Sequence, residues 1–391
     1  PGLTALSSNN FKDVVRVITH PSYSKVDLHN HPESKERIEA IVDVLEHLSS
    51  FAYESPYAFL NWRESYLELV HSSDWVNRVR TLSNELSATG RTNVVLESEL
   101  EVRAGSYEVA CLAVRGVLHG VELVLSKPDV LLSIALVRPP GHLAGNKICI
   151  FNNIAIGARY AQQKEGIRAK RVLIVDCDAH HGKNSHDVFY HGSPYQDFSI
   201  VYFSTHQDNI HPGTGKFFER GIDNGNGYIF NVPIPAFSGD RAYQEVLDRV
   251  LEPLLEHYQP DLILVSMGLD AHYKDHFSQL EFSAFSFRSL ARLLYDYSKA
   301  FPCYGVVAAL EGGYALDEMG NCVAEFIKTF SAQMPTDLTP HFGSSHLEHD
   351  LLAFDRDANS TILRESNDWV QELRSLNSEI KTMWPQARKS V

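Results

Sequence analysis

The sequence predicts an α/β fold in which a central, mainly parallel sheet is covered by helices on both faces. Short apolar segments rich in β-branched residues alternate along the chain with longer amphipathic segments. The apolar segments are continuous rather than alternating, which is typical of strands that are covered on both faces. The repeated order of strand and helix favours parallel strands joined by right-handed crossovers. A chain of 391 residues with 44% hydrophobic residues can bury a large core.

The individual strands and helices follow from the same pattern. Strands are expected at residues 131–137, 172–176, 199–203, 262–267 and 304–310. Helices are expected at residues 35–50, 107–125, 153–163, 241–257, 283–300 and 316–330. Because no internal repeat or low-complexity linker interrupts the chain before about residue 331, residues 1–330 are predicted to form one domain.

Residues 331–391 are predicted to form a C-terminal extension that consists of a loop and an amphipathic helix. The loop is polar and contains Pro and Gly, which favour surface turns. In the helix, Trp369, Leu373, Leu376 and Ile380 are spaced four, three and four residues apart and form an apolar stripe. The stripe is too short for a coiled coil. It is expected to dock on the domain, and a subunit contact in a homo-oligomer is the alternative.

Charge and composition limit the partners and the location of the protein. Asp and Glu number 49 against 35 Lys and Arg, which gives a net charge of -14. Such a chain lacks the electrostatic basis for direct binding to nucleic acid. No apolar run approaches the length of a membrane span, and the first residues do not resemble a signal peptide. The sequence therefore predicts a soluble, cytoplasmic protein without a membrane partner, whose five cysteines are reduced.

Acidic residues and a histidine follow two of the predicted strands. Asp176, Asp178 and His180 alternate where one strand ends, so their side chains share a face. Asp270 follows the strand at 262–267. Asp178, His180 and Asp270 together would supply three metal ligands and leave one position open, as catalytic zinc sites do. The alternative is that these acids only cap helices or line loops.

Two further strand ends carry residues that could take part in catalysis. The segment LEGGY at 310–314 places Tyr314 after paired glycines, and RPPGH at 138–142 ends in His142. A tyrosine in that position can donate a hydrogen bond to a developing oxyanion. Taken alone, either residue is more typical of a packed core.

Eight motifs in a fixed order now identify a family resemblance. The chain resembles the zinc-dependent histone deacetylase and acetylpolyamine amidohydrolase family over roughly residues 15–330, and HPESKERI at 31–38 resembles its N-terminal segment. The resemblance implies the three-layer arginase/deacetylase fold and a deacetylase-like catalytic domain. The motifs are RPPGH at 138–142, CIFNN at 149–153, DCDAHHG at 176–182, STH at 204–206, PGTG at 212–215, NVPIP at 231–235, SMGLDAH at 266–272 and LEGGY at 310–314.

The resemblance also assigns roles to residues. It implies that Asp178, His180 and Asp270 bind Zn²⁺, and that Tyr314 polarises the scissile carbonyl. His142 matches the first histidine of the family's tandem pair, with Asp176 as its partner. In the family, zinc and a general base activate water, which attacks an acyl amide. A structural K⁺ is implied at Asp176, Asp178, His180, Ser204 and Thr205.

The sequence departs from the family at the position of the general base. The second tandem histidine is replaced by Leu143, which cannot transfer a proton. The Asp or Asn that orients this histidine in the family is replaced by Lys183. Both the base and the residue that supports it are therefore absent from their usual positions.

The predicted substrate pocket departs from the family as well. Ile148 stands where the family has a phenylalanine, in a loop that is about four residues shorter, and His211 replaces the opposite aromatic wall. The family's Asp-Pro-Leu becomes Asp275, His276 and Phe277. A pocket lined by Leu143, Ile148, His211 and Phe277 is less aromatic and more polar than one that grips an extended acyl-lysine.

Three hypotheses about function follow. The first is a zinc amidohydrolase that acts on an acyl-lysine, an acylpolyamine or another acylated small molecule, with His142 or His211 in proton transfer. Its intact metal ligands and Tyr314 favour it. The second is a catalytically impaired protein that retains zinc for binding or assembly. The third is a different zinc-dependent reaction on a small metabolite, with Tyr314 as the acid or base.

Overall fold

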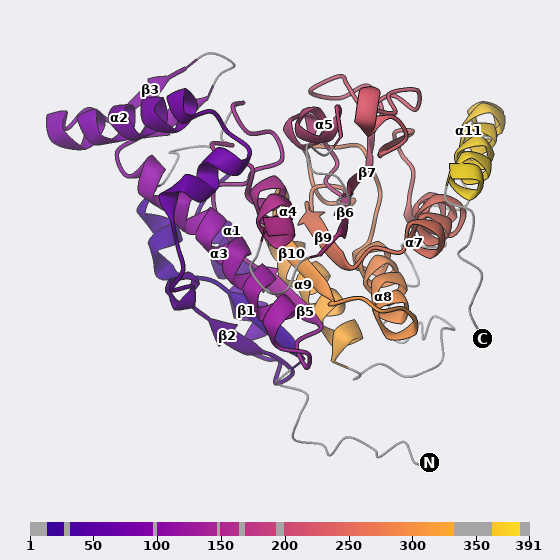
Figure 1. Ribbon diagram of the computed structural model, residues 1–391, viewed down its shortest axis with the longest axis horizontal. Helices are drawn as coiled ribbons and strands as arrows, with labels where there is room; N and C mark the ends of the chain where they lie inside the picture. Colours follow the sequence, from indigo (N-terminus) through magenta and orange to yellow (C-terminus); the bar gives the residue numbers. More distant parts are fainter. Residues whose placement is uncertain are drawn as a thin grey trace.

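The computed structural model has a central sheet of eight parallel strands, and this confirms the predicted fold class (Figure 1). The structure describes residues 14–26, 32–96, 100–146, 149–163, 169–192, 199–331 and 362–383. The strand order is β2-β1-β5-β10-β9-β6-β7-β8. The strands are β1 (Val15–Ile18), β2 (Ala52–Glu54), β5 (Leu132–Ala135), β6 (Arg171–Asp176), β7 (Ser199–Gln207), β8 (Ile229–Ile234), β9 (Leu262–Met267) and β10 (Val306–Leu310). A separate antiparallel hairpin consists of β3 (Asn93–Val95) and β4 (Glu101–Arg103).

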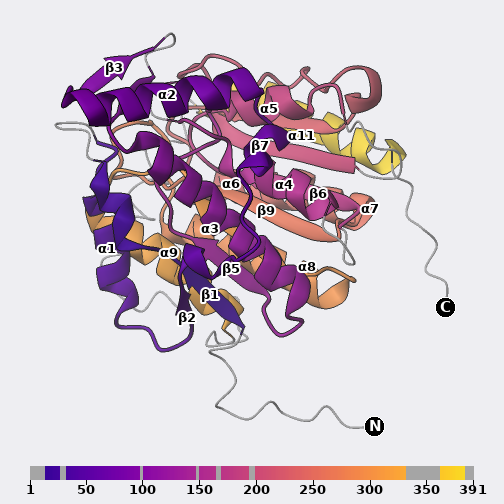
Figure 2. The ribbon, with the colours of Figure 1, turned by 60° about the vertical axis from the view of Figure 1, so that its left-hand side comes forward.

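Helices cover both faces of the sheet, so the fold has three layers with the sheet in the middle (Figures 1 and 2). Helices α3 and α4 pack together against β5, β9 and β10, while α1, α8 and α9 pack together on the opposite face. The helices are α1 (Glu36–Leu45), α2 (Ser73–Thr89), α3 (Ser106–Ser126), α4 (Asn153–Gln163), α5 (Lys183–Phe189), α6 (Asp240–Val246), α7 (Glu252–Tyr258), α8 (Ala284–Ala300), α9 (Leu316–Phe330) and α11 (Ile362–Met383), and a π-helical turn (Leu247–Leu251) joins α6 to α7.

All five predicted strands are present, but three strands near the edges of the sheet were not predicted. β1 and β2 have four and three residues, so their apolar patterns are too short to stand out. β8 contains Asn231 and Pro233, which weaken a strand signal. β7 also continues beyond the predicted end, because its polar residues 204–207 pair with β8. Tertiary pairing therefore extends strands that local sequence does not mark.

Helix α3 passes through the interior of the domain. Within the described residues it is long and apolar enough to cross a membrane by length and composition, yet 78% of its most apolar window is buried. Gly120 lies where α3 meets the sheet, and a Cβ there would come within 2.8 Å of the Ser133 hydroxyl. The apolar character of α3 is thus explained by burial in the core.

Helix α11 packs against α7 and the π-helical turn. Leu373, Leu376 and Ile380 from the predicted stripe are buried there. The indole Nε1 of Trp369 donates to the carbonyl of Pro233 at 2.9 Å. The helix therefore contacts the domain through its apolar stripe, whereas the proposed division at residue 331 adjoins a stretch outside the described residues and stays a prediction.

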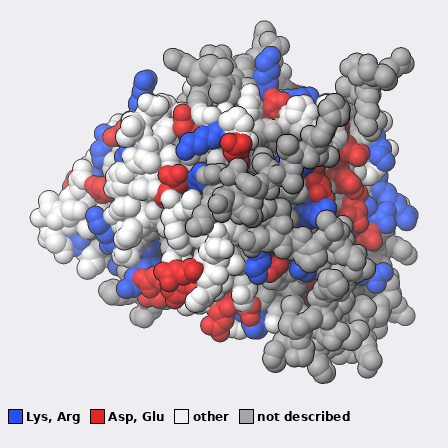
Figure 3. All heavy atoms as spheres, turned by 90° about the horizontal axis from the view of Figure 1, so that it is seen from below, with Lys and Arg blue, Asp and Glu red and all other residues white. Residues whose placement is uncertain are grey.

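The described surface carries charges of both signs. On the face shown in Figure 3, Lys and Arg side chains are interspersed with Asp and Glu side chains. Ion pairs between helical neighbours such as Lys183 and Asp187 contribute to this mixture. Exposed pairs of this kind add little to stability.

Candidate metal centre and active site

The carboxyl ends of β10, β9, β6 and β7 meet at one edge of the sheet, because these four strands are neighbours. Asp176 is the last residue of β6 and pairs with Ser266 of β9, while Leu310 of β10 pairs with Met267. The loops that follow these strands therefore open side by side, as functional loops do in α/β sheets. They carry the predicted metal ligands and Tyr314.

Asp178, His180 and Asp270 converge in this region. The Nδ1 atom of His180 lies 2.8 Å from Oδ2 of Asp270 and 3.2 Å from Oδ1 of Asp178. One potential ligand atom from each residue lies within 4.8 Å of the others, and both carboxylates are buried. Two carboxylates and one imidazole in this arrangement suit a divalent cation such as zinc.

The surroundings of the two carboxylates fit a bound cation. The backbone N–H of Gly312 donates to Oδ2 of Asp178, and that of Ala179 donates to Oδ1 of Asp270, each at 2.8 Å. A Cβ at Gly312 would lie 2.6 Å from an oxygen of each carboxylate, so only glycine leaves room there. The backbone therefore fixes the ligands in place and keeps the space between them open.

The electrostatics of the cluster favour the binding of a cation. Burial, together with the neighbouring Asp178, raises the pKa of Asp270 to about 6. Burial opposes the protonation of His180, but Asp270 and Asp178 raise its pKa to about 10. Two buried carboxylates thus share a single imidazole, and a divalent cation would compensate the remaining charge.

His142 and Asp176 form the pair that was predicted beside the metal ligands. The Nδ1 atom of His142 lies 3.1 Å from Oδ2 of Asp176, and its Nε2 atom lies 3.7 Å from Oδ2 of Asp178. Oδ2 of Asp176 also accepts a hydrogen bond from the Tyr202 hydroxyl at 2.8 Å. Burial opposes the charged imidazole, but Asp178 and Asp176 raise the pKa of His142 well above its usual range. The pair therefore holds the His142 ring with Nε2 toward the metal ligands.

Glu311 is a buried acidic residue beside His142 that the sequence analysis missed. Its Oε2 atom accepts hydrogen bonds from the backbone N–H groups of Gly141 at 2.6 Å and His142 at 3.2 Å, and Ser266 donates to its Oε1 atom at 3.2 Å. Burial raises the pKa of Glu311 to about 7. Its position directly after β10 is the signal that could have identified it, since Asp176 and Asp270 were found in the same way.

Tyr314 is held between a cation and an aromatic ring. The guanidinium of Arg37 lies 4.9 Å from the centre of its ring, and the ring of Phe277 lies 4.5 Å away. Oδ2 of Asp275 accepts a hydrogen bond from the backbone N–H of Tyr314 at 2.6 Å. Burial raises the pKa of Tyr314 well above its usual range, so the hydroxyl stays protonated and can donate a hydrogen bond.

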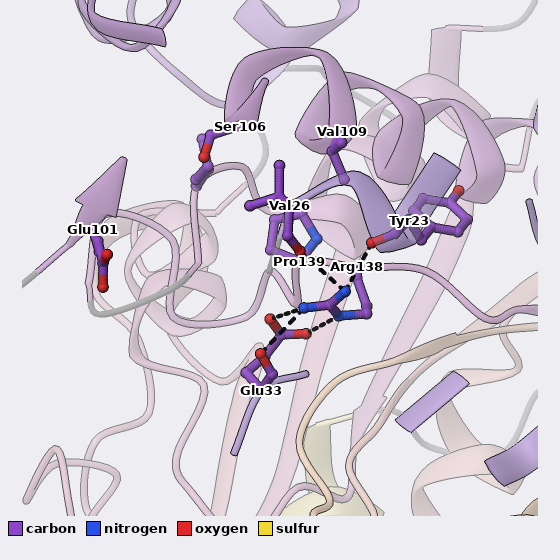
Figure 4. Close-up of a pocket in the computed structure, with 9 residues that line it drawn as sticks. Tyr23, Val26, Glu33, Glu101, Ser106, Val109, Arg138 and Pro139 are labelled. Carbon is purple, nitrogen blue, oxygen red and sulfur yellow. Dashed lines mark hydrogen bonds and ion pairs between the residues drawn. The ribbon is translucent and has the colours of Figure 1, made fainter. Parts of the chain in front are cut away.

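Arg37 belongs to a buried charge cluster with Glu33 and Arg138. Figure 4 shows the contacts between Glu33 and Arg138 in this cluster. The Glu33 carboxylate accepts two hydrogen bonds from Arg138, Nε to Oε1 at 2.5 Å and Nη2 to Oε2 at 2.8 Å, and a third from Arg37 at 3.2 Å. The Nε atom of Arg37 donates to the carbonyl of Gly313 at 2.6 Å. A cavity of about 20 Å³ beside Arg138 has room for about one water molecule. The cluster therefore braces the loop that carries Tyr314.

Ser204 and Thr205 belong to β7 and lie beside Asp176, the last residue of β6, as the K⁺ hypothesis requires. Both are buried, and Ser204 pairs with Asp176 across the sheet. The Ser204 hydroxyl lies 2.9 Å from Nδ1 of His206, and the Thr205 hydroxyl donates to the Asp176 carbonyl at 3.4 Å. These contacts place the residues together, and K⁺ binding stays a prediction.

The predicted pocket residues lie on the outer side of the site. His211 is exposed, and its Nε2 atom lies 3.5 Å from Nδ2 of Asn146, three residues after the half-buried Leu143. Phe277 is 46% exposed and contacts Tyr314, as described above. Ile148 lies outside the described residues. We call His211, Phe277 and Leu143 the rim.

Comparisons with known proteins agree with this geometry. The family model described as the histone deacetylase domain matches residues 31–330. The HD domain of HDA15, for which a crystal structure is known, is similar with a TM-score of 0.73 and 25% identity, and the match covers 95% of this chain and 97% of that one. This likeness extends over nearly the whole of both chains.

Curated relatives share about a third of their residues with this chain. It is 34% identical to histone deacetylase 10, chloroplastic, of Oryza sativa subsp. japonica over 314 residues, which covers 77% of this chain and 69% of the relative. It is 30% identical to a probable deacetylase of Archaeoglobus fulgidus over 311 residues, which covers 78% and 82% respectively. The extent of these matches and the shared fold show that this chain belongs to the histone deacetylase domain family.

Proposed function

We propose that the protein is a zinc-dependent hydrolase that cleaves an acyl amide. The observation that carries this proposal is the convergence of Asp178, His180 and Asp270 at the carboxyl edge of the sheet, next to the loop that ends in Tyr314. These three residues would hold the zinc ion, which when bound supplies a Lewis acid. Family membership supports an acylated substrate.

The residues of the chain divide the remaining tasks between them. Tyr314, protonated and braced by Arg37, donates a hydrogen bond to the carbonyl oxygen as negative charge develops on it. His142 would pass a proton from the attacking water to the leaving amine, because its Nδ1 atom is fixed by Asp176 while Nε2 faces the metal ligands. Glu311 positions His142 by accepting a hydrogen bond from its backbone N–H.

A protein that binds zinc without efficient turnover is the second candidate function. Two observations favour it: Leu143 replaces the usual base, and Lys183 forms an ion pair with Asp187 at the surface instead of supporting an imidazole. Loss of a general base lowers rates by about 10²- to 10⁴-fold. His142 is the residue on which the choice between the two functions depends.

Turnover of defined acyl amides tests the proposal. The zinc-loaded protein would be given a capped acetyl-lysine, an acetyl-lysine peptide and an acetylated diamine, with Asp178→Ala as the inactive variant. Asp187→Ala is the matched control, since its side chain is 52% exposed on α5 and lies outside the metal cluster. We expect turnover that disappears only in Asp178→Ala. One bound zinc per chain without turnover of any probe would instead support the binding-only function.

A further inference from the structure

The side chain of Tyr202 reaches the carboxyl edge of the sheet from within β7. Tyr202 pairs with Ile174 of β6, and Asp176 lies two residues further along the same strand. Because side chains two residues apart share a face of the sheet, Tyr202 and Asp176 are diagonal neighbours. The Tyr202 hydroxyl lies 2.8 Å from Oδ2 of Asp176 and 3.3 Å from the carbonyl oxygen of Gly182.

Oδ2 of Asp176 is shared between two side chains. Nδ1 of His142 lies 3.1 Å from this atom, while the other oxygen, Oδ1, accepts a hydrogen bond from the backbone N–H of Asp178 at 3.3 Å. An ionised carboxylate can only accept, so the Tyr202 hydroxyl is the donor in its contact. A carboxylate oxygen that is held by two donors resists rotation. Tyr202 therefore fixes the direction in which Asp176 faces the imidazole.

The backbone at Gly182 closes another side of this contact. A Cβ at this residue would lie 2.2 Å from Oδ2 of Asp176, 2.6 Å from the Tyr202 hydroxyl and 3.0 Å from Nδ1 of His142. The chain thus passes against all three groups at once. Asp176 and Tyr202 have no exposed surface, and His142 is buried as well. Bulk water is excluded from the contact, so loss of the Tyr202 hydroxyl would leave the carboxylate without that donor.

The ring of Tyr202 is held in place by two imidazoles. The ring centres of His181 and His186 lie 6.3 Å and 6.4 Å from that of Tyr202, and both histidines meet it in edge-to-face geometry. Both histidines are buried. Edge-to-face packing of this kind is a favoured arrangement of aromatic rings. The hydroxyl is therefore presented to Asp176 by a ring whose own position is restricted.

The orientation of His142 has particular importance in this chain. Leu143 and Lys183 stand where the family has its second histidine and the residue that orients it. In the proposed function, His142 therefore transfers the proton, and its Nε2 atom lies 3.7 Å from Oδ2 of Asp178. Rotation of the Asp176 carboxylate would turn the imidazole and move Nε2 away from this place.

We propose that Tyr202 is a positioning residue that fixes Asp176 and, through it, the His142 ring for proton transfer. This proposal rests on the proposed hydrolase function and adds to it a residue behind the His142 pair. The Tyr202 hydroxyl contacts Asp176 and Gly182 rather than the metal cluster. Since proton transfer occurs in the transition state, Tyr202 should affect kcat and leave KM unchanged.

Tyr202→Phe tests the proposal, because it removes the hydroxyl and keeps the ring. We expect kcat for the acetyl-lysine peptide to fall by about tenfold to a hundredfold, as for one hydrogen bond to a charged group. KM should change by less than about twofold, and bound zinc should be retained. Tyr258→Phe is the matched control, since the buried Tyr258 hydroxyl contacts Ser199 and Val172 near the opposite ends of β7 and β6.

The same substitution in a His142→Ala background separates positioning from general support of the fold. If Tyr202 acts through His142, adding Tyr202→Phe to His142→Ala should lower kcat by less than about twofold further. Equal losses in the two backgrounds would overturn the proposal, because Tyr202 would then act independently of the imidazole. A higher KM with unchanged kcat would also overturn it, since Tyr202 would then support substrate binding.

Nuclear magnetic resonance of the zinc-loaded protein with isotope-labelled Tyr and His gives readouts that need no turnover. In the wild type we expect a Tyr202 hydroxyl proton that is protected from exchange with solvent, and rapid exchange would overturn the proposal. The ring signals of His142, identified by their absence in His142→Ala, should shift in Tyr202→Phe and stay in place in Tyr258→Phe.

The two proposals fail in different ways. A shift of the His142 signals in Tyr202→Phe, without turnover of any probe by the wild type, supports the positioning role and contradicts the hydrolase function. Turnover that is equal in Tyr202→Phe and the wild type, with the His142 signals in place, contradicts the positioning role and supports the hydrolase function.

Discussion

The residues that could bind metal, Asp178, His180 and Asp270, and the residues of the rim differ in how firmly the fold fixes them. We call the first group the metal side. Asp178 and Asp270 are buried and each accepts a backbone hydrogen bond from a loop at the sheet edge. At the rim, His211 is exposed and Phe277 is 46% exposed. Changes at the metal side would leave buried charges without partners, whereas changes at the rim only exchange solvated groups. Metal binding and substrate choice can therefore vary independently.

Asp178→Ala, which changes the metal side, should have the largest effect on activity. We expect the loss of bound metal and a decrease in turnover of at least about 10³-fold, because one of three protein ligands is removed. Metal content per chain, measured by plasma mass spectrometry, and turnover of the acetyl-lysine peptide check this. Asp187→Ala should retain both. Full metal content in Asp178→Ala would show that the cluster is not the metal centre.

His142→Ala tests whether proton transfer belongs to the metal side. We expect kcat to fall by about 10²- to 10⁴-fold while the metal is retained, because the imidazole next to the metal ligands is lost. His211→Ala should change kcat by less than about twofold, since His211 is an exposed rim residue. The opposite result, a loss in His211→Ala alone, would move the proton-transfer group to the rim.

Leu143→His with Lys183→Asp restores the family's missing base and the carboxylate that orients it. We expect turnover of a capped acetyl-lysine to rise by about tenfold or more, and by less with Leu143→His alone, because an unsupported imidazole is poorly oriented. Leu143→His with Lys183→Ala is the control for the loss of the lysine. No gain in the first double variant would identify the rim as the main obstacle to this substrate.

Glu311→Gln tests, through the pH dependence of stability, whether the buried Glu311 carboxyl has a raised pKa. The pKa of Glu311 is raised by burial from 4.5 to about 7, so the folded state binds an extra proton between these values. The resulting stabilisation is complete below about pH 4.5 and is lost as the pH rises through about 7. We expect the variant to lose less stability than the wild type between pH 5 and pH 8, by about 1–3 kcal/mol. Urea unfolding at both pH values measures this.

Exposed Glu39 of α1 provides the control for this experiment. Glu39→Gln should leave the difference in stability between pH 5 and pH 8 as it is in the wild type. An identical pH dependence in Glu311→Gln and the wild type would show that Glu311 titrates normally.

Leu373→Ala should have the smallest effect on chemistry. Leu373 belongs to α11 and its side chain is buried, so its truncation should weaken the docking of this helix by about 2–4 kcal/mol. Turnover of the capped acetyl-lysine should change by less than about twofold, since α11 packs on α7 and supplies no residue of the metal cluster. Hydrogen exchange of α11 and capped-substrate kinetics check this, with exposed Ser375→Ala as the control. A large loss of turnover would show that α11 supports the metal side.

Much of the metal side was predictable from sequence for a simple physical reason. The carboxyl ends of neighbouring parallel strands meet at one edge, so acids placed directly after buried strands converge there. Asp178, His180 and Asp270 follow this rule. Glu311 follows it as well, because it comes directly after β10.

The sequence by itself determined the fold class, the five central strands and the residues of the metal cluster, because continuous apolar runs and strand-end acids are local signals. Only the tertiary structure decided which distant loops meet. Arg37 reaches Tyr314, and Gln207 joins Gln279, through the order of the strands and the packing of loops on them. The edge strands depend on the same long-range contacts, which no local pattern of apolar and polar residues encodes.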